Sequence, residues 1–283
     1  MNIFKERYKE MGGDVEFFKL KRCIRVNTNK VSMRELKSRL EAKGVEVEKV
    51  SYLKNGFYVK STKFNLVSSP EYLLGLFYIQ DAAAQVPVEV LNPVGVALDA
   101  FAAPGGKTTQ MVKYCNVVAI ENNAERFKAL ENNIERLGVD NCIAYLKDFR
   151  TVEKKFDYIL LDAPCSGNYM LEDHWLRKYK LDRVKKNAEK QKEFISHAIG
   201  LLNKGGILVY STCSLEPEED EEVIQYAIDN FDVKLEKIDL RVGDPGLTNI
   251  FGNSYDKTMV YCKRFWPSKT ETIGFFVARL RKC

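Results

Sequence analysis

Two cysteines lie in polar turns that follow apolar runs, and a thiol in this setting can act as a nucleophile. Cys165 follows FDYILLDAP (156–164) in the motif LDAPCSG, and Cys213 follows GGILVY in YSTCSLEPEED. A cysteine that only fills space usually has apolar neighbours, whereas a polar turn can stabilise a thiolate. If the two runs are neighbouring strands, their ends lie about 5 Å apart. The sequence therefore predicts one cleft with two thiols.

The other cysteines do not suggest a disulfide framework or a metal site. The chain has seven cysteines, an odd number, and no pair has C-x-x-C spacing. Cys115 and Cys142 lack a polar turn and are predicted to be core residues. With only two histidines, a His-based metal site or a Ser/His triad is not expected. We expect no bound metal and a reducing, cytoplasmic compartment.

A second candidate site is the turn DAFAAPGGKTTQ (99–110), which follows another apolar run. In open α/β sheets, ligands bind beyond the carboxyl ends of the strands, where glycine allows close backbone approach and a helix offers N–H groups. A phosphate-binding P-loop needs a glycine five residues before Gly106, where this sequence has Phe101. The dinucleotide fingerprint G-x-G-x-x-G is also absent. A nucleoside-binding turn remains the interpretation.

Two acids support a nucleoside site. Glu121 lies 22 residues after Asp99 at the end of the next apolar run, where a carboxylate can accept both ribose hydroxyls. Asp148 ends the run CIAYLKD and is placed to accept from an adenine amino group. An acid at a strand end is often only a turn former. In combination with APGG, however, the two acids predict a cofactor site.

The elements that position these residues have the pattern of an α/β fold. From residue 94 onward, β-branched runs alternate with helical patterns, which is typical of a doubly wound parallel sheet. Seven strands are predicted, at 94–101, 116–121, 142–148, 156–164, 205–214, 234–240 and 273–280. A helix is predicted at 125–138, ending at a glycine. The acidic EPEEDEE (216–222) is expected to form the first turn of a helix to Asn230, where carboxylates favour the helix dipole.

Residues 1–90 are predicted to form a small α+β module with linking helices, and residues 91–283 the main domain. Strands are expected at 22–28, 45–50 and 56–60, with a helix at 32–44. Residues 1–70 contain sixteen Lys or Arg and eight Asp or Glu, a net +8 in a chain of net charge +5. This asymmetry favours an anionic polymer as partner, although a solvated Lys-rich surface explains it equally well.

The motifs together resemble the RNA cytosine-5 methyltransferases of the Nop and Sun type. The resemblance extends over nearly the whole chain, through RVNT, YIQDAAAQ, AAPGGKT, LDAPCSG, YSTCSLEPEE and RFWP…GFFVARL. It implies S-adenosylmethionine as cofactor, bound in a seven-stranded Rossmann-like methyltransferase sheet. The sequence departs from the family at Phe101, usually Cys, and at Ser268, Lys269 and Ile273 near the C-terminus.

The resemblance also implies a mechanism. Carbon 5 of cytosine is a poor nucleophile, so a thiolate must first add to carbon 6, a role that falls to Cys213. Cys165 would then aid removal of the carbon 5 proton and release of the enzyme. Asp162 would hydrogen-bond the cytosine near nitrogen 3 and its amino group. Lys107 would meet RNA phosphate or the base, unless it is only a helix-surface lysine.

The candidate cofactor-binding residues are Ala102, Ala103, Pro104, Gly105, Gly106, Lys107, Glu121, Arg126, Asp148 and Asp162. A basic stretch at 177–192, with eight Lys or Arg in sixteen positions, is either a solvated helix face or a hold on the RNA backbone. In the second interpretation, Trp175 and Tyr179 would stack a base.

The expected partner is RNA, with tRNA preferred because the N-terminal module is minimal and there is no long basic tail. Ribosomal RNA is the alternative. A DNA methyltransferase would instead use the Pro-Cys thiol as nucleophile, and a non-enzymatic RNA-binding scaffold need not retain both thiols. No apolar stretch of eighteen residues and no leader is present, so we expect a soluble protein that does not enter a membrane. We also expect a monomer.

Overall fold

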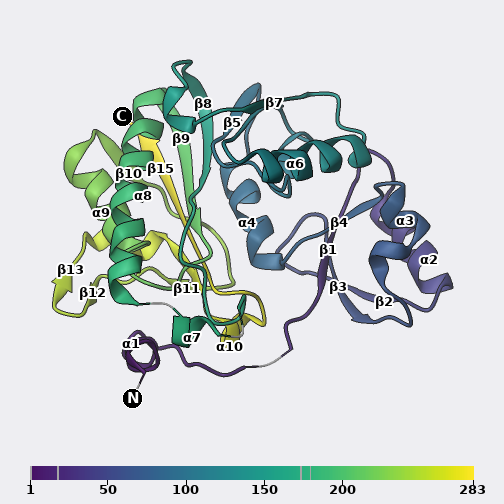
Figure 1. The fold of residues 1–283 in the computed structure, drawn as a ribbon, viewed down its shortest axis with the longest axis horizontal. Coiled ribbons are helices and arrows are strands. Elements are labelled where there is room, and N and C mark those ends of the chain that lie inside the picture. The colour runs from purple at the N-terminus through teal and green to yellow at the C-terminus, as the bar shows by residue number, and fades with distance from the viewer. Residues whose placement is uncertain (1, 18, 173, 179) are drawn as a thin grey trace. The chain divides into compact units, whose positions relative to one another are not determined.

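The computed structural model describes residues 2–17, 19–172, 174–178 and 180–283, so Tyr179 lies outside the described residues (Figure 1). The chain divides into two compact units. The central unit is Leu20–Phe149, and the flanking unit combines Met1–Lys19 with Arg150–Cys283. Within the described ranges, every helix is too short or too polar to span a bilayer.

The first part of the central unit contains the strands and the helix predicted for the N-terminal module. Four antiparallel strands pair in the order β2-β3-β1-β4. Their bounds are β1 (Cys23–Val26), β2 (Glu46–Lys49), β3 (Gly56–Ser61) and β4 (Phe77–Ile79). Helix α2 (Met33–Ala42) begins where Ser32 Oγ accepts from the Glu35 N–H, 3.1 Å away, and buries Leu36 and Leu40. The short helices η1 (Leu66–Ser68) and α3 (Pro70–Leu73) precede β4.

The second part of the central unit alternates strands and helices as the sequence predicts. It consists of α4 (Ala82–Leu91), β5 (Val96–Asp99), α5 (Thr108–Met111), β6 (Asn116–Glu121), α6 (Ala124–Leu137) and β7 (Cys142–Leu146). The three strands are parallel neighbours, with β6 between β5 and β7. Helix α6 ends at Gly138, whose φ of 67° is the predicted left-handed cap.

Strands in this unit differ from the prediction at their ends: β5, for example, covers Val96–Asp99 and not 94–101. Strand β7 ends at Leu146, opposite Glu121, because β6 provides no further strand residues to pair with. Asp148 therefore lies in the connection that follows β7, before η2 (Phe149–Thr151), and does not end the strand.

The flanking unit contains the remaining predicted strands. Strands β8 (Phe156–Asp162) and β9 (Leu202–Thr212) are parallel, and β15 (Phe275–Lys282) runs antiparallel to β9. Strand β10 (Val233–Leu235) is shorter than the predicted 234–240 because its pairing with β15 covers only these three residues. Two short strands that were not predicted, β14 (Lys263–Phe265) and β11 (Asp244–Pro245), extend the sheet beyond β15.

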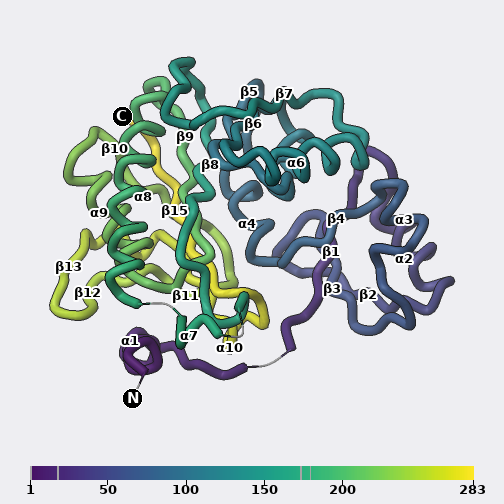
Figure 2. Tube along the Cα trace, viewed as in Figure 1, coloured from purple at the N-terminus to yellow at the C-terminus, as the bar shows by residue number. Residues whose placement is uncertain are grey.

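Helices complete the flanking unit. These are α1 (Ile3–Glu10), α7 (Trp175–Lys178), α8 (Leu181–Leu201), α9 (Glu221–Asn230), η3 (Lys257–Tyr261) and α10 (Pro267–Thr270), with a small hairpin of β12 (Asn249–Ile250) and β13 (Asn253–Ser254). The long helix α8 packs against β8, β9 and α9. Figure 2 shows α1 and the C-terminal end of β15 at opposite ends of this unit.

An aromatic cluster fixes α1 to the rest of the flanking unit. Phe4 and Tyr8 of α1 pack with Trp175, whose ring centroid lies 4.7 Å from that of Phe4. Trp175 is only 1% exposed, and its Nε1–H donates to the Ser166 carbonyl over 2.7 Å. The prediction that Trp175 stacks an RNA base is therefore wrong, because its ring is buried in the core.

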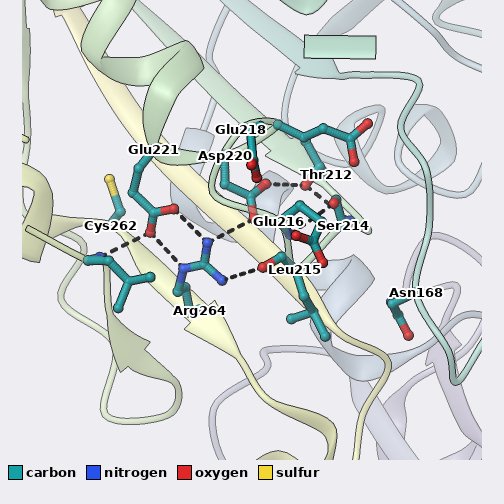
Figure 3. Close-up of polar contacts among 12 residues, drawn as sticks. Asn168, Thr212, Ser214, Leu215, Glu216, Glu218, Asp220, Glu221, Cys262 and Arg264 are labelled. Atoms are coloured by element: carbon teal, nitrogen blue, oxygen red, sulfur yellow. Dashed lines mark hydrogen bonds and ion pairs between the residues drawn. The ribbon is translucent and has the colours of Figure 1, made fainter. Parts of the chain in front are cut away.

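The acidic segment 216–222 is structural, as expected, but for a different reason. Helix α9 does reach Asn230, yet Asp220 and Glu221 are fully buried and do not lie on a solvated first turn. Arg264 of β14, also fully buried, forms ion pairs with Glu221 at 2.5 Å and Asp220 at 3.3 Å (Figure 3). It also donates to the Leu215 carbonyl. The acids thus bind the start of α9 to β14.

We expect Arg264→Met to destabilise the protein strongly. The substitution leaves two buried carboxylates without their cation, which typically costs about 3–5 kcal/mol of unfolding free energy. Urea unfolding of both proteins measures the difference. The matched control is Arg281→Met, which breaks a more exposed pair with Glu236 and is expected to lose under ~1 kcal/mol. Equal losses in the two variants would contradict the importance of the buried network.

A second ion pair predicts a pH dependence. Glu216 is fully buried and accepts from Arg7 of α1 over 2.8 Å, and burial raises its pKa to about 7 from an ordinary value of 4.5. A carboxyl with a raised folded-state pKa contributes stability that is complete below about pH 4.5 and is lost as the pH rises through about 7.

Glu216→Gln removes this titration while keeping the side chain's size. The stability of wild type relative to Glu216→Gln is therefore expected to fall as the pH rises from 4.5 to 7, by at most about 1.4 kcal/mol per pH unit. Urea unfolding of both proteins at several pH values in this range measures it. A difference that stays constant or grows with pH would show that Glu216 does not titrate in this way.

Candidate active site

The two thiols lie together at the edge of the flanking unit's sheet. Strands β8 and β9 are parallel, with Asp162 opposite Ser211, so the segments that follow the two strands leave the sheet at the same edge. The turns that follow place the Sγ atoms of Cys165 and Cys213 2.8 Å apart. The predicted proximity of the thiols is therefore present in the structure.

The contact between the sulfurs affects their protonation. The hydrogen bond with Cys213 and the burial of the side chain raise the pKa of the Cys165 thiol well above its ordinary value, and the charge of Glu219 adds to this effect. Cys165 is consequently a thiol at neutral pH, and either sulfur can be the donor in the contact between the two side chains. A sulfur that accepts a hydrogen bond is better able to carry negative charge. The geometry therefore brings both sulfurs to one place, and the assignment of Cys213 as the nucleophile stays a prediction.

Asp162 is the third predicted residue of this set. It is half-buried at the end of β8, and its Oδ1 accepts from the Ser211 hydroxyl over 2.6 Å. This bond fixes the carboxylate three residues before Cys165.

The glycine-rich turn belongs to the central unit and is held tightly there. The Ala103–Pro104 peptide bond is cis, and Gly105 has a φ of 102°, which side chains other than glycine's rarely allow. The turn's carbonyls are also tied to α6: Asn133 donates to that of Pro104 over 2.9 Å, and Arg126 to that of Ala103 over 2.7 Å. These hydrogen bonds tie the turn between β5 and α5 to α6.

Glu121, the last residue of β6, has the form of a preorganised acceptor. It is 1% exposed, and its Oε1 accepts from the N–H groups of Asn122 and Asn123 over 3.0 and 2.9 Å. Among the described residues, no group donates a hydrogen bond to its Oε2, and Arg126 Nη1 lies 3.7 Å away. A carboxylate that is fixed through one oxygen and can accept hydrogen bonds with the other suits a ligand with hydroxyl groups, such as a ribose.

Arg25 of β1 was missed as a site residue by the sequence reasoning. Its guanidinium is buried and donates to the Gly106 carbonyl, to Thr109 Oγ1 at 2.8 Å and to Gln80 Oε1 at 2.6 Å. Burial lowers its pKa to about 10, so it remains charged at neutral pH. It therefore braces the glycine-rich turn from the N-terminal strands. The signal in the sequence was a charged residue in the middle of the predicted strand RCIRVNT (22–28).

The structure distributes the predicted residues over both units. Cys165, Cys213 and Asp162 belong to the flanking unit, and the central unit holds Ala102, Ala103, Pro104, Gly105, Gly106, Lys107, Glu121, Arg126 and Asp148. Lys107 is half-buried at the start of α5, and Asp148 is half-buried after β7. The roles assigned to these residues remain predictions.

The fold is that of the Rossmann-like methyltransferases. The chain superimposes on a methyltransferase homologue from Pyrococcus horikoshii with a TM-score of 0.86 and 39% identity, over 94% of this chain and 88% of that one. The chain also superimposes on NSun6 from the same organism, which was solved with SFG, an analogue of S-adenosylmethionine. The TM-score is 0.82 and the identity 27%, over 93% of this chain and 91% of that one.

Family models identify the chain more closely. Residues 88–281 match the model for 16S rRNA methyltransferase RsmB/F, and residues 3–82 match the model for the N-terminal domain of 16S rRNA methyltransferase RsmF. The chain belongs to the RsmB/F family of RNA cytosine-5 methyltransferases, whose cofactor is S-adenosylmethionine.

Two curated relatives differ in length. The tRNA (cytosine(49)-C(5))-methyltransferase of Pyrococcus abyssi is 36% identical over 98% of this chain and 94% of its own. Ribosomal RNA small subunit methyltransferase F of Vibrio campbellii is 35% identical over 93% of this chain, which spans only 57% of that longer protein.

We expect Glu121→Ala to weaken the binding of S-adenosylmethionine by roughly 10- to 100-fold, because each lost hydrogen bond to a charged acceptor is worth about 1.5–3 kcal/mol. Calorimetric titration measures the affinity, and thermal unfolding checks that the variant is folded. Glu131→Ala, on the exposed side of α6, is the control. Unchanged affinity in folded Glu121→Ala would remove Glu121 from the cofactor site.

Proposed function

We propose that this chain transfers a methyl group from S-adenosylmethionine to carbon 5 of cytosine in RNA, through a covalent bond between Cys213 and the base. The observation that carries the proposal is the pair of sulfurs 2.8 Å apart in the turns that follow the neighbouring strands β8 and β9. S-adenosylmethionine, when bound, supplies the electrophilic methyl group, and we assign its ribose to Glu121 and its close backbone contacts to residues 102–106.

The protein's own residues perform the remaining steps in this proposal. The Cys213 thiolate adds to carbon 6, which breaks the 5,6 double bond and makes carbon 5 nucleophilic. Asp162, fixed by Ser211, orients the base near nitrogen 3 and its amino group. After methylation, carbon 5 loses its proton and the Cys213 sulfur leaves carbon 6, which restores the double bond. Cys165 assists this last stage. The target cytosine must leave any base stack to reach the thiols.

We propose tRNA as the substrate, with ribosomal RNA as the second candidate. The Pyrococcus abyssi relative named for tRNA matches this chain over almost the full length of both. The Vibrio relative named for ribosomal RNA is much longer, although the family models carry the ribosomal name. The charge of +8 in residues 1–70 supports a polyanionic partner. We further propose a monomer in the cytoplasm, where the thiols stay reduced.

The two thiols are expected to fail in different ways when replaced. Cys213→Ala cannot form the covalent bond, so it should be inactive and leave no protein joined to RNA in a denaturing gel. Cys165→Ala can still attack, so it should release slowly and accumulate a denaturant-stable adduct in the presence of S-adenosylmethionine. Radiolabelled methyl transfer to total tRNA, ribosomal RNA and DNA from a source lacking the modification measures activity and substrate. Cys142→Ala is the control, since Cys142 lies outside this turn pair.

Each alternative has its own outcome in this experiment. An adduct in Cys213→Ala that disappears in Cys165→Ala would reverse the roles and support a mechanism of the DNA methyltransferase type. Full activity in both variants would make the thiols structural. RNA binding without methyl transfer by the wild-type protein would favour a non-enzymatic scaffold.

A further inference from the structure

The residues that directly follow the two cysteines are both serines, and they meet at one buried carboxylate. Ser166 and Ser214 have their hydroxyl oxygens 3.4 Å apart. The Glu219 side chain accepts from the Ser166 N–H over 3.0 Å and from the Ser166 hydroxyl over 2.5 Å. Glu219 is fully buried, and Ser166 and Ser214 are nearly or fully buried. The carboxylate is therefore bonded to the turn that carries Cys165, at the point where this turn meets the one carrying Cys213.

Glu219 is itself anchored to β9 and α8. Its carbonyl oxygen accepts from the Tyr210 hydroxyl over 2.6 Å. Gln191 of α8 donates to Glu219 Oε1 over 3.3 Å and to the Pro164 carbonyl over 2.8 Å. Pro164 and Ser166, which flank Cys165, are thus both hydrogen-bonded to the pair formed by Gln191 and Glu219. The hydrogen bond from Tyr210 connects this pair to β9, the strand that leads to Cys213.

Glu219 differs from its acidic neighbours in the partners that it has. The neighbouring acids Asp220 and Glu221 are paired with Arg264, whereas the donors to Glu219 named above are neutral. Burial raises the pKa of Glu219, while hydrogen bonds from Ser166, Ser214 and Asn187 lower it. A carboxylate without a neutralising cation at a buried position disfavours a second negative charge nearby.

We propose that Glu219 is a positioning residue for the methyl transfer proposed above: it fixes the Cys165 turn against the Cys213 turn so that the sulfurs touch. The charge of Glu219 also disfavours the thiolate form of Cys165. The inference rests on the proposed function for its catalytic meaning. The geometry that it describes exists without substrate, so it can be tested separately.

The direct test is the pH profile of cysteine alkylation in the free protein. Wild type and Glu219→Gln are treated with iodoacetamide between pH 6 and 10, and peptide mass spectrometry follows Cys165 and Cys213. Glutamine keeps the size of the side chain and removes its charge. We expect the Cys165 profile to shift to lower pH in Glu219→Gln, with an increase in rate of about threefold or more at pH 8. Glu219→Asp, which retains the charge, should restore the wild-type profile.

Two further variants make the result specific. Glu216→Gln changes another buried carboxyl of the same segment that pairs with Arg7, so it should leave the Cys165 profile unchanged. Ser166→Ala removes the 2.5 Å hydrogen bond while keeping the charge of Glu219. It should loosen the turn and slow methyl transfer without the shift in alkylation. Ser166→Ala also provides the test if Glu219→Gln does not fold, and normal methyl transfer by Ser166→Ala would then contradict the inference.

Methylation assays connect the geometry to the reaction. We expect Glu219→Gln to lower kcat and to accumulate the denaturant-stable RNA adduct, with little change in KM for RNA, because release depends on the position of Cys165 against Cys213. An unshifted Cys165 profile together with normal kcat would overturn the inference and leave the proposed function intact. A shifted profile in a protein whose wild type transfers no methyl group would support the positioning role of Glu219 and refute the proposed function.

Discussion

Parallel pairing of β8 with β9 is the interaction on which the thiol site depends. The register that places Asp162 opposite Ser211 determines that the two cysteine turns leave the sheet side by side. A shift by one residue would turn each alternating side chain to the other face of the sheet and separate the sulfurs. The apolar residues of both strands, which are buried, fix this register. Catalytic geometry therefore follows from core packing.

Burial of the acidic segment is the second constraint in the flanking unit. Carboxylates removed from water need partners, and here the partners come from elements far apart in sequence: Arg7 of α1, Arg264 of β14 and Ser166 of the Cys165 turn. Each partner links the segment after Cys213 to a different element. The helix α1 and the strand β14 thereby become part of the support of the site, although neither carries a thiol.

In the central unit, too, buried charged side chains are held by hydrogen bonds, and here they are one cation and one carboxylate. Arg25 places a buried cation against the carbonyl of Gly106, and Glu121 has its orientation set by two backbone N–H groups. In both places a charged group is held by backbone atoms, so its position depends little on side-chain freedom. Rigid turns of this kind bind a ligand with a smaller loss of conformational entropy than flexible loops do.

The amino-acid sequence by itself determined the seven main strands after residue 94, the helices α6 and α9, the family, and the positions of Glu121 at a strand end and of Cys165 and Cys213 in the turns after strands. These features depend on local patterns: apolar runs, glycine caps and motifs. Only the tertiary structure decided that 216–222 is buried, that Trp175 is a core residue, that β7 stops at Leu146, and that Arg25 and Glu219 brace the two turns. Burial and ion pairing join residues up to 211 positions apart, and no local pattern records which distant partner a charged side chain meets.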